Sequence, residues 1–195
     1  NLETLTLRVY RLDLESYFRK MHTLGGIDAL ELSLIKPDAT APVRVEGFEK
    51  HRELEWTLPL PVTGEGAWAI NLGDESYEAT TLVVVTDLAV ITKSTRGEVF
   101  VFAQDLVQGK PRPGAKVLVS DGRKVLVEGV TGADGVWRAA VDELKQAGDV
   151  RVFARAGASA ASDQMPIGAL AVAQALEARG FVYTDRPGYR PGDTV

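Results

Sequence analysis

Large apolar side chains alternate with polar or small ones over much of this chain, and this pattern restricts its fold most. The alternation is clearest in Asp28–Ile35, Glu53–Leu58 and Trp68–Leu72. A period of two places the large side chains on one face of a strand, as in half-buried antiparallel sheets. Two runs, Leu82–Val85 and Val99–Phe102, are apolar throughout, which predicts strands that are buried on both faces or pass between two domains. The chain is therefore expected to be largely antiparallel β-structure.

One segment has the helical period instead. From Leu14 to Leu24 apolar residues recur at i, i+3, i+4, i+7 and i+10. Asp13 is suited to be the N-cap, and Gly25-Gly26 can end the helix. We expect a helix over Leu14–Leu24 that covers one end of a sheet, and a single helical turn over Asp142–Ala147.

Turn residues divide the second half of the chain. Asp121-Gly122 tolerates the positive φ of a tight hairpin, so the apolar runs on either side should pair. Thr131–Gly135 predicts a further reversal. Gly109–Gly114 contains two prolines, which cannot donate ladder hydrogen bonds, and is expected to be a loop.

The spacing of these turns predicts a two-sheet sandwich. The small-residue stretch Ala156–Ala178 is either a long loop or a loop followed by the last strand. The seven expected strands are Leu82–Thr92, Val99–Ala103, Val117–Ser120, Lys124–Val130, Val136–Ala140, Val150–Ala154 and, most weakly, Ala169–Ala173.

Composition excludes several classes of protein. With 45% apolar and 25% charged residues the chain is not wholly disordered, and a formal charge of −5 argues against binding to nucleic acid. The absence of cysteine excludes disulfides, thiol nucleophiles and cysteine zinc sites. The longest uncharged stretch, Gln164–Leu176, contains Pro166 and is too short to span a membrane. The opening Asn-Leu-Glu, without Met or an apolar leader, is expected of an excised or processed piece.

The C-terminal run is the most specific motif. It matches the pattern Tyr/Gln-Thr-Asp-Arg/Lys-Pro-x-Tyr-Arg/Lys-Pro-Gly-x-x-Val in register. The departure is Gly188, at the first x position, where sequences with this pattern usually have an apolar or β-branched residue. This pattern resembles the opening strand of a macroglobulin domain in the alpha-2-macroglobulin family. The nine matching positions that precede the final Val of the pattern are Tyr183, Thr184, Asp185, Arg186, Pro187, Tyr189, Arg190, Pro191 and Gly192.

Further stretches resemble bacterial members of the same family. These are Thr86–Val90 with Asp105–Val117, Thr131–Gly135 as a hairpin signature, and Val9–Lys20 near the N-terminus. The resemblance implies an all-β fold: tandem antiparallel β-sandwiches of the macroglobulin or fibronectin-III type, with one short helix in the first. The implied domains are 1–80, 81–178, and 179–195 as a linker and the first strand of a truncated third domain.

The resemblance also implies a function for the parent molecule. The chain would be a scaffold fragment of a broad-spectrum endopeptidase inhibitor that traps proteases after a bait loop is cleaved. Its expected partners are target proteases, through the parent, and neighbouring macroglobulin domains, with no nucleic acid and no direct membrane insertion. The expected location is periplasmic or otherwise extracytoplasmic, with any lipid anchor outside this fragment. Two alternatives stay open: an extracytoplasmic Ig-like binding or adhesion module, and an accessory domain of a hydrolase.

No residue is assigned a catalytic, cofactor-binding or metal-binding role, no cofactor is expected, and the chain is not expected to be an enzyme. Gly64–Ala69 fits a dinucleotide fingerprint formally, but Pro59 and Pro61 precede it and an alternating strand follows, so it is interpreted as a turn. His22 and His51 lack further ligands at zinc-site spacing and are expected on the solvated surface.

Three further groups have simpler structural explanations. Aspartates next to glycine are explained by turn geometry rather than calcium. Tryptophans on alternating strands are explained by core packing rather than sugar binding. The two C-terminal arginines are expected to be solvated. The residues concerned are Asp121, Asp134 and Asp149; Trp56, Trp68 and Trp137; and Arg186 and Arg190.

Overall fold

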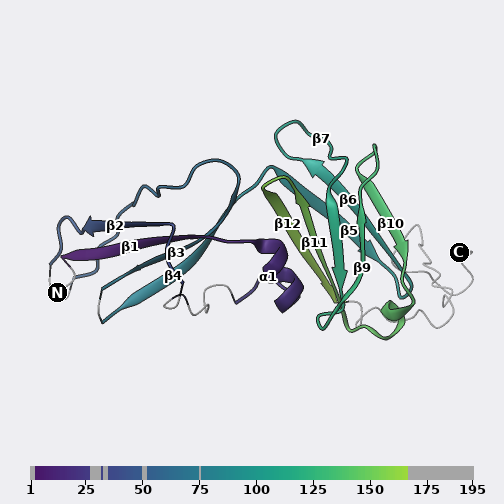
Figure 1. Cartoon of the computed structure of the whole chain (residues 1–195), viewed down its shortest axis with the longest axis horizontal. Helices are drawn as coiled ribbons and strands as arrows, with labels where there is room; N and C mark the ends of the chain where they lie inside the picture. The colour runs from purple at the N-terminus through teal and green to yellow at the C-terminus, as the bar shows by residue number, and fades with distance from the viewer. Residues whose placement is uncertain (1–2, 27–31, 33–34, 50–51, 75, 167–195) are drawn as a thin grey trace, which may run out of the picture.

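Antiparallel strands form most of the regular structure, as the alternation predicts. The computed structural model describes residues 3–26, 32, 35–49, 52–74 and 76–166. These residues form two units arranged along the long axis of the molecule (Figure 1). The first is a single sheet with a helix at one end, and the second is a sandwich of two sheets. No helix among the described residues is long and apolar enough to cross a membrane.

The first unit contains one four-stranded sheet with the order β2-β1-β3-β4, in which every pair is antiparallel. Its strands are β1 (Thr4–Arg11), β2 (Ala39–Arg44), β3 (Gly66–Gly73) and β4 (Glu78–Val85). The two central strands supply most of the buried residues: Leu7, Val9 and Tyr10 from β1, and Ala67, Trp68, Ala69 and Ile70 from β3.

The second unit is a sandwich of two antiparallel sheets, which confirms the expected all-β class. One sheet has the order β10-β6-β5, with β7 paired to β6, and the other has the order β12-β11-β8-β9. We call them the β6 sheet and the β11 sheet. The first contains β5 (Leu88–Ser94), β6 (Glu98–Asp105), β7 (Lys110–Pro111) and β10 (Val136–Ala140); the second contains β8 (Lys116–Ser120), β9 (Val125–Val130), β11 (Asp149–Ala156) and β12 (Ser159–Pro166).

The core of the sandwich lies between these two sheets. Alternate residues of the central strands point inward and are fully buried, as the pleat of a strand requires. They are mostly valines, whose branched side chains pack well on a pleated surface. The members from β6, β8 and β11 are Val99, Val101, Ala103, Val117, Val119, Val150, Val152 and Ala154.

The predicted helix is present as α1 (Leu14–Met21). Asp13 is its N-cap, as expected, and accepts hydrogen bonds from the backbone N–H groups of Glu15 and Ser16. The helix ends earlier than the predicted Leu24, because His22 adopts a left-handed φ of 56° and its N–H bonds to the carbonyl of Phe18. The predicted turn at Asp142–Ala147 is the 3₁₀ helix η2 (Asp142–Gln146).

The predicted strand Glu53–Leu58 is wrong. Residues 52–63 form no strand, and Leu58, Leu60 and Val62 instead pack on the cluster around Trp68 on one face of the first sheet. The alternation of apolar and polar residues here reflects side chains that pack on a sheet, in a segment whose backbone does not pair with a strand. The predicted strand Asp28–Ile35 lies largely outside the described residues.

Two runs were predicted to be buried on both faces or to pass between two domains. Neither is buried on both faces, and Leu82–Val85 ends next to the passage between the two units. Val84 and Val85 are 39% and 41% exposed because β4 is an edge strand of the first sheet. In Val99–Phe102 only Val99 and Val101 are fully buried. The predicted strand Leu82–Thr92 is interrupted at Thr86-Asp87, where the chain passes from the first sheet to the sandwich.

The turn predictions had mixed outcomes. The β8–β9 hairpin is confirmed, with Gly122 at a φ of 87°. Thr131–Gly135 joins strands of different sheets, so the hairpin reading of this reversal is wrong. Gly109–Gly114 contains the short strand β7, which Pro111 can join because β7 is at a sheet edge. In the stretch Ala156–Ala178, Ala156 ends β11 and Ser159–Pro166 form β12, so its described part is not a long loop. The remainder, with the expected strand Ala169–Ala173, lies outside the described residues.

Candidate functional site: the joint between the two units

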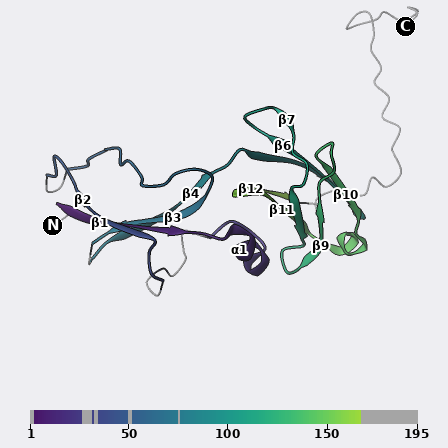
Figure 2. The ribbon, with the colours of Figure 1, turned by 45° about the horizontal axis from the view of Figure 1, so that its top comes forward.

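The outer face of the β11 sheet carries α1 (Figures 1 and 2). The helix was predicted to cover one end of a sheet, but it covers a face of the sheet in the neighbouring unit. Phe18 of the helix is fully buried and stacks on Phe153 of β11, with ring centroids 5.3 Å apart and an interplanar angle of 22°. Offset stacking of this kind stabilises aromatic pairs beyond the area they bury. We call this contact the joint.

The joint has an apolar cluster of its own, separate from the core of the sandwich. Its six buried members come equally from the two units. The first unit contributes Leu14, Phe18 and Ala67, and the second contributes Leu118, Phe153 and Ala160. A shared cluster of this composition resists separation of the units, because separating them would return its apolar surface to water.

Glu15 is the centre of an ion-pair network at the rim of this cluster. Its carboxylate accepts hydrogen bonds from Lys116 Nζ at 2.6 Å and from Arg19 Nη2 at 3.0 Å, and lies 3.2 Å from Arg155 Nε. Lys116 and Arg155 belong to the second unit, so the network crosses the joint. The hydrogen bond from Lys116 is the main cause that lowers the pKa of Glu15 below its usual value.

A second ion pair extends the network across the joint. The guanidinium of Arg19 binds Glu128 of β9 through two parallel hydrogen bonds, both 2.7 Å. Bidentate pairs fix orientation as well as distance. The hydrogen bond between the two side chains lowers the pKa of Glu128 and raises that of Arg19.

The C-terminal end of the helix is also held by the second unit. Arg151 Nη1 of β11 donates to the carbonyl oxygen of His22 at 3.2 Å. His22 was expected on the solvated surface, but it is half-buried at the joint and its Nδ1 is enclosed. It acts there as a helix cap. His51 lies outside the described residues.

The chain passes between the two units at Thr86-Asp87, and this segment is held as well. Arg112 Nη1 contacts the carboxylates of Asp87 at 3.2 Å and of Asp105 at 2.7 Å. The N–H of Leu106 donates to the carbonyl oxygen of Asp87 at 2.6 Å. The pKa of Asp105 is lowered, first by the hydrogen bond from the Gln108 N–H. The connection is therefore fixed to the β6–β7 turn.

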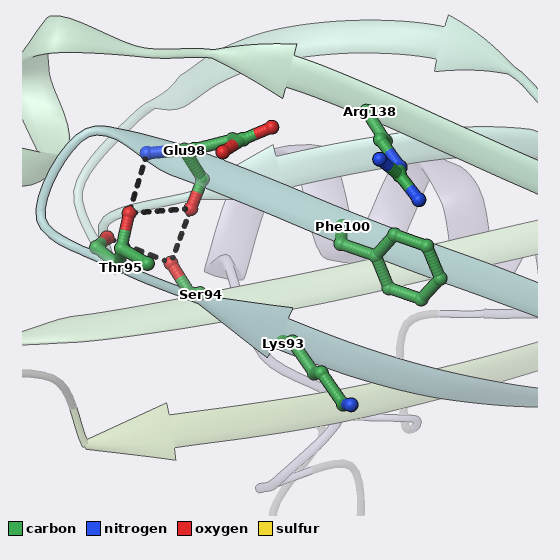
Figure 3. A pocket seen from close by; sticks show the side chains of 6 residues that line it. All are labelled: Lys93, Ser94, Thr95, Glu98, Phe100 and Arg138. Carbon is green, nitrogen blue, oxygen red and sulfur yellow. Dashed lines mark hydrogen bonds between the residues drawn. The ribbon is translucent and has the colours of Figure 1, made fainter.

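A second surface feature lies on the β6 sheet, on the side away from its core. It is a shallow depression of about 370 Å³ beside the β5–β6 turn (Figure 3). Thr95 braces the turn, because its hydroxyl accepts from the N–H of Glu98 at 3.1 Å. The depression is lined by Lys93, Ser94, Thr95, Glu98, Phe100 and Arg138.

Most of the glycines and aspartates that were interpreted as turn residues do lie in turns. Gly64–Ala69 is a turn that enters β3. Asp121 and Asp134 accept hydrogen bonds from backbone N–H groups within their own turns. Asp149 differs, since its carboxylate lies 3.8 Å from Arg151. The described residues contain no group of three or more side chains able to hold a metal ion.

The three tryptophans differ in environment. Trp68 is buried in β3, and Trp137 packs on the sandwich core, where its ring fills the space that a Cβ at Gly129 would need. Trp56 is 39% exposed on a segment that forms no strand, so the core reading is wrong for it. Arg186 and Arg190 lie outside the described residues.

Sequence reasoning missed the joint, although two signals were present. Val117–Val119 and Val152–Ala154 are apolar at three successive positions, and the outward member of each, Leu118 or Phe153, lies in the joint. The spacing of Glu15 and Arg19 also favours a helical ion pair. Neither signal identifies the partner surface.

The comparisons with known proteins agree with this architecture. The family model for the bacterial alpha-2-macroglobulin MG3 domain matches residues 85–184. The chain belongs to the bacterial alpha-2-macroglobulin family. A curated relative, alpha-2-macroglobulin of Ralstonia nicotianae, is 30% identical over 142 residues. That match covers 71% of this chain and only 8% of the relative, so the chain corresponds to a small part of a much longer protein.

Two solved structures show the same fold. Both are native alpha-2-macroglobulin from Escherichia coli, one spanning domains MG0-NIE-MG1 and the other NIE-MG1. The first has a TM-score of 0.62 and 18% identity over 84% of this chain and 55% of that one. The second has a TM-score of 0.59 and 17% identity over 86% and 85%.

Proposed function

We propose that this chain is a two-unit scaffold within a bacterial alpha-2-macroglobulin that traps endopeptidases. Its own contribution is to hold two consecutive units in a fixed mutual orientation. The observation that carries this proposal is the joint, whose six buried residues come equally from both units. A scaffold that must transmit a rearrangement through a long chain needs joints of this kind, because freely hinged units would absorb the motion.

Family membership supports the parent's role, and it favours the scaffold over an adhesion module or a hydrolase accessory domain. The parent would be periplasmic or otherwise extracytoplasmic, with any lipid anchor outside residues 1–195. Target proteases would be bound by the parent and not by this chain.

The side chains at the joint support a structural rather than catalytic role. Glu15, Arg19, Lys116 and Glu128 are hydrogen-bonded or ion-paired with one another. These side chains are engaged with one another, whereas a general acid or base must be placed to exchange a proton with a substrate. We propose that the chain has no enzymatic activity of its own.

The test is protease trapping by the whole protein that contains this chain. A trapped protease should lose activity on protein substrates and keep activity on a small peptide substrate. We expect Phe18→Ala combined with Phe153→Ala to impair trapping, and Tyr77→Ala, in the exposed turn between β3 and β4, to leave it intact. The isolated chain should inhibit neither trypsin-like nor subtilisin-like proteases. Stoichiometric inhibition by the isolated chain, or no trapping by the whole protein, would contradict the proposal.

A further inference from the structure

The outer surface of the β6 sheet, which we call the open face, carries two rows of side chains. The strand register places Lys93, Phe100 and Arg138 in one row, and Ile91, Phe102 and Val136 in the next. Their neighbours Val99 and Val101 point into the core, so these six residues point away from it. Each row therefore runs across all three principal strands.

The open face is both apolar and basic. Ile91 is 53% exposed, and both Lys93 and Arg138 are exposed. The guanidinium of Arg138 lies 5.0 Å from the ring centroid of Phe100, within the range of a cation–π contact. Glu98 lies at the rim (Figure 3), but no ion pair among the described residues joins it to either cation.

The covered face of the β11 sheet has the same chemistry. There Phe153 and Leu118 form one row, and Arg155 and Lys116 form the next. Helix α1 meets this face with an aromatic ring, Phe18, and a carboxylate, Glu15. The apolar row of the sheet thus contacts the ring of Phe18, and the two cations beside it bind the carboxylate of Glu15.

We propose that the open face docks another domain of the parent chain through a carboxylate beside an apolar side chain. This proposal rests on the proposed function, since it requires a parent with further domains. Charge complementarity carries it: Lys93 and Arg138 favour an acidic partner, and the exposed Ile91 and half-buried Phe100 favour an apolar one. A second copy of this chain fits poorly, because two-fold stacking of the same face would oppose cation to cation.

Acetylation kinetics of Lys93 test the proposal directly. The lysines of the whole protein and of the isolated chain are labelled under identical conditions and quantified by mass spectrometry, with exposed Lys124 as an internal reference. We expect Lys93 to react at least about tenfold more slowly in the whole protein, and Lys124 to react similarly in both. Equal rates at Lys93 would overturn the proposal.

Charge reversal then tests the chemistry of the contact. Arg138→Glu in the whole protein should restore fast labelling of Lys93, whereas Arg44→Glu, an equal change of charge on exposed β2, should not. Protection that survives Arg138→Glu would show that the partner is not acidic and would overturn the proposal.

Protection of Lys93 in the isolated chain, together with a dimeric mass, would mean that a second copy occupies the face and would also overturn the proposal. Trapping is assayed separately, so loss of trapping with Lys93 still protected would contradict only the proposed function.

Discussion

The two outer faces of the sandwich have similar side chains but different surroundings. On the β11 sheet the pair Phe153 and Leu118 is completely buried beneath α1, and the adjacent cations are paired with Glu15. On the β6 sheet the corresponding ring, Phe100, is half-buried, and Lys93 and Arg138 are exposed. The sandwich core itself is complete between the sheets. This difference indicates that α1 connects the two units and is not needed to complete the core of the sandwich.

The largest expected effect comes from truncating the aromatic ring of the covered face. Phe153→Ala should lower the free energy of unfolding by about 3–5 kcal/mol, because it removes a stacked partner and leaves a cavity beneath α1. Phe100→Ala, on the open face, should cost less than about 1.5 kcal/mol because its ring already contacts solvent. Denaturant unfolding monitored by circular dichroism measures both. Equal losses would remove the distinction between the faces.

Removing the central acid of the joint should have the next largest effect. Glu15→Ala should lower the free energy of unfolding by about 1–3 kcal/mol, because it deprives Lys116 and Arg155 of their carboxylate. The matched substitution Glu98→Ala at the open face should change it by no more than about 0.5 kcal/mol. Chemical denaturation of the two variants makes the comparison, and a greater loss for Glu98→Ala would contradict it.

The same carboxylates give the joint a dependence on pH. The pKa values of Glu15 and Glu128 are lower in the folded chain than in the unfolded chain. The folded state therefore binds fewer protons, so this contribution to stability is complete above the unfolded pKa, about 4.5, and is lost as pH falls through the folded values. We expect Glu15→Gln combined with Glu128→Gln to flatten the acid limb of the stability profile. An unchanged acid limb would show that the joint carboxylates do not cause it.

The sequence predicted the sandwich better than the first unit, for a physical reason. Hairpins such as β8–β9 are encoded locally, by a turn that requires positive φ between two apolar runs. The segment 52–63 alternates as a strand does, yet it packs on a sheet face without pairing. Periodicity reports which side chains are buried but not which backbone groups pair.

The joint itself was beyond sequence reasoning because it is a contact between residues distant in the chain. The start of α1 was predicted from Asp13 and from the apolar residues at helical spacing that follow it. The surface that α1 covers depends on Phe153 and Lys116, more than 100 positions further along the chain. The family resemblance found in 183–195 could not locate the joint either, since it concerns residues outside the described part.

A smaller effect is expected from the cap of the covering helix. Asp13→Ala should cost about 1 kcal/mol, because the N–H groups of Glu15 and Ser16 lose their acceptor. Lys20→Ala in the same helix should be nearly neutral, since both residues are good helix formers. Thermal unfolding of the two variants checks this. If Asp13→Ala is neutral as well, the capping hydrogen bonds do not set the stability of α1 on the covered face.

The central claim, that the joint fixes the two units relative to each other, is tested by a distance distribution. The chain has no cysteine, so spin labels can be placed by Thr40→Cys in β2 and Ala140→Cys in β10, both exposed. Pulsed electron–electron double resonance should give one narrow distance distribution, which should broaden when Phe18→Ala and Glu15→Ala are added. A broad distribution in the doubly labelled chain without these two changes, or one that they leave unaltered, would contradict the account.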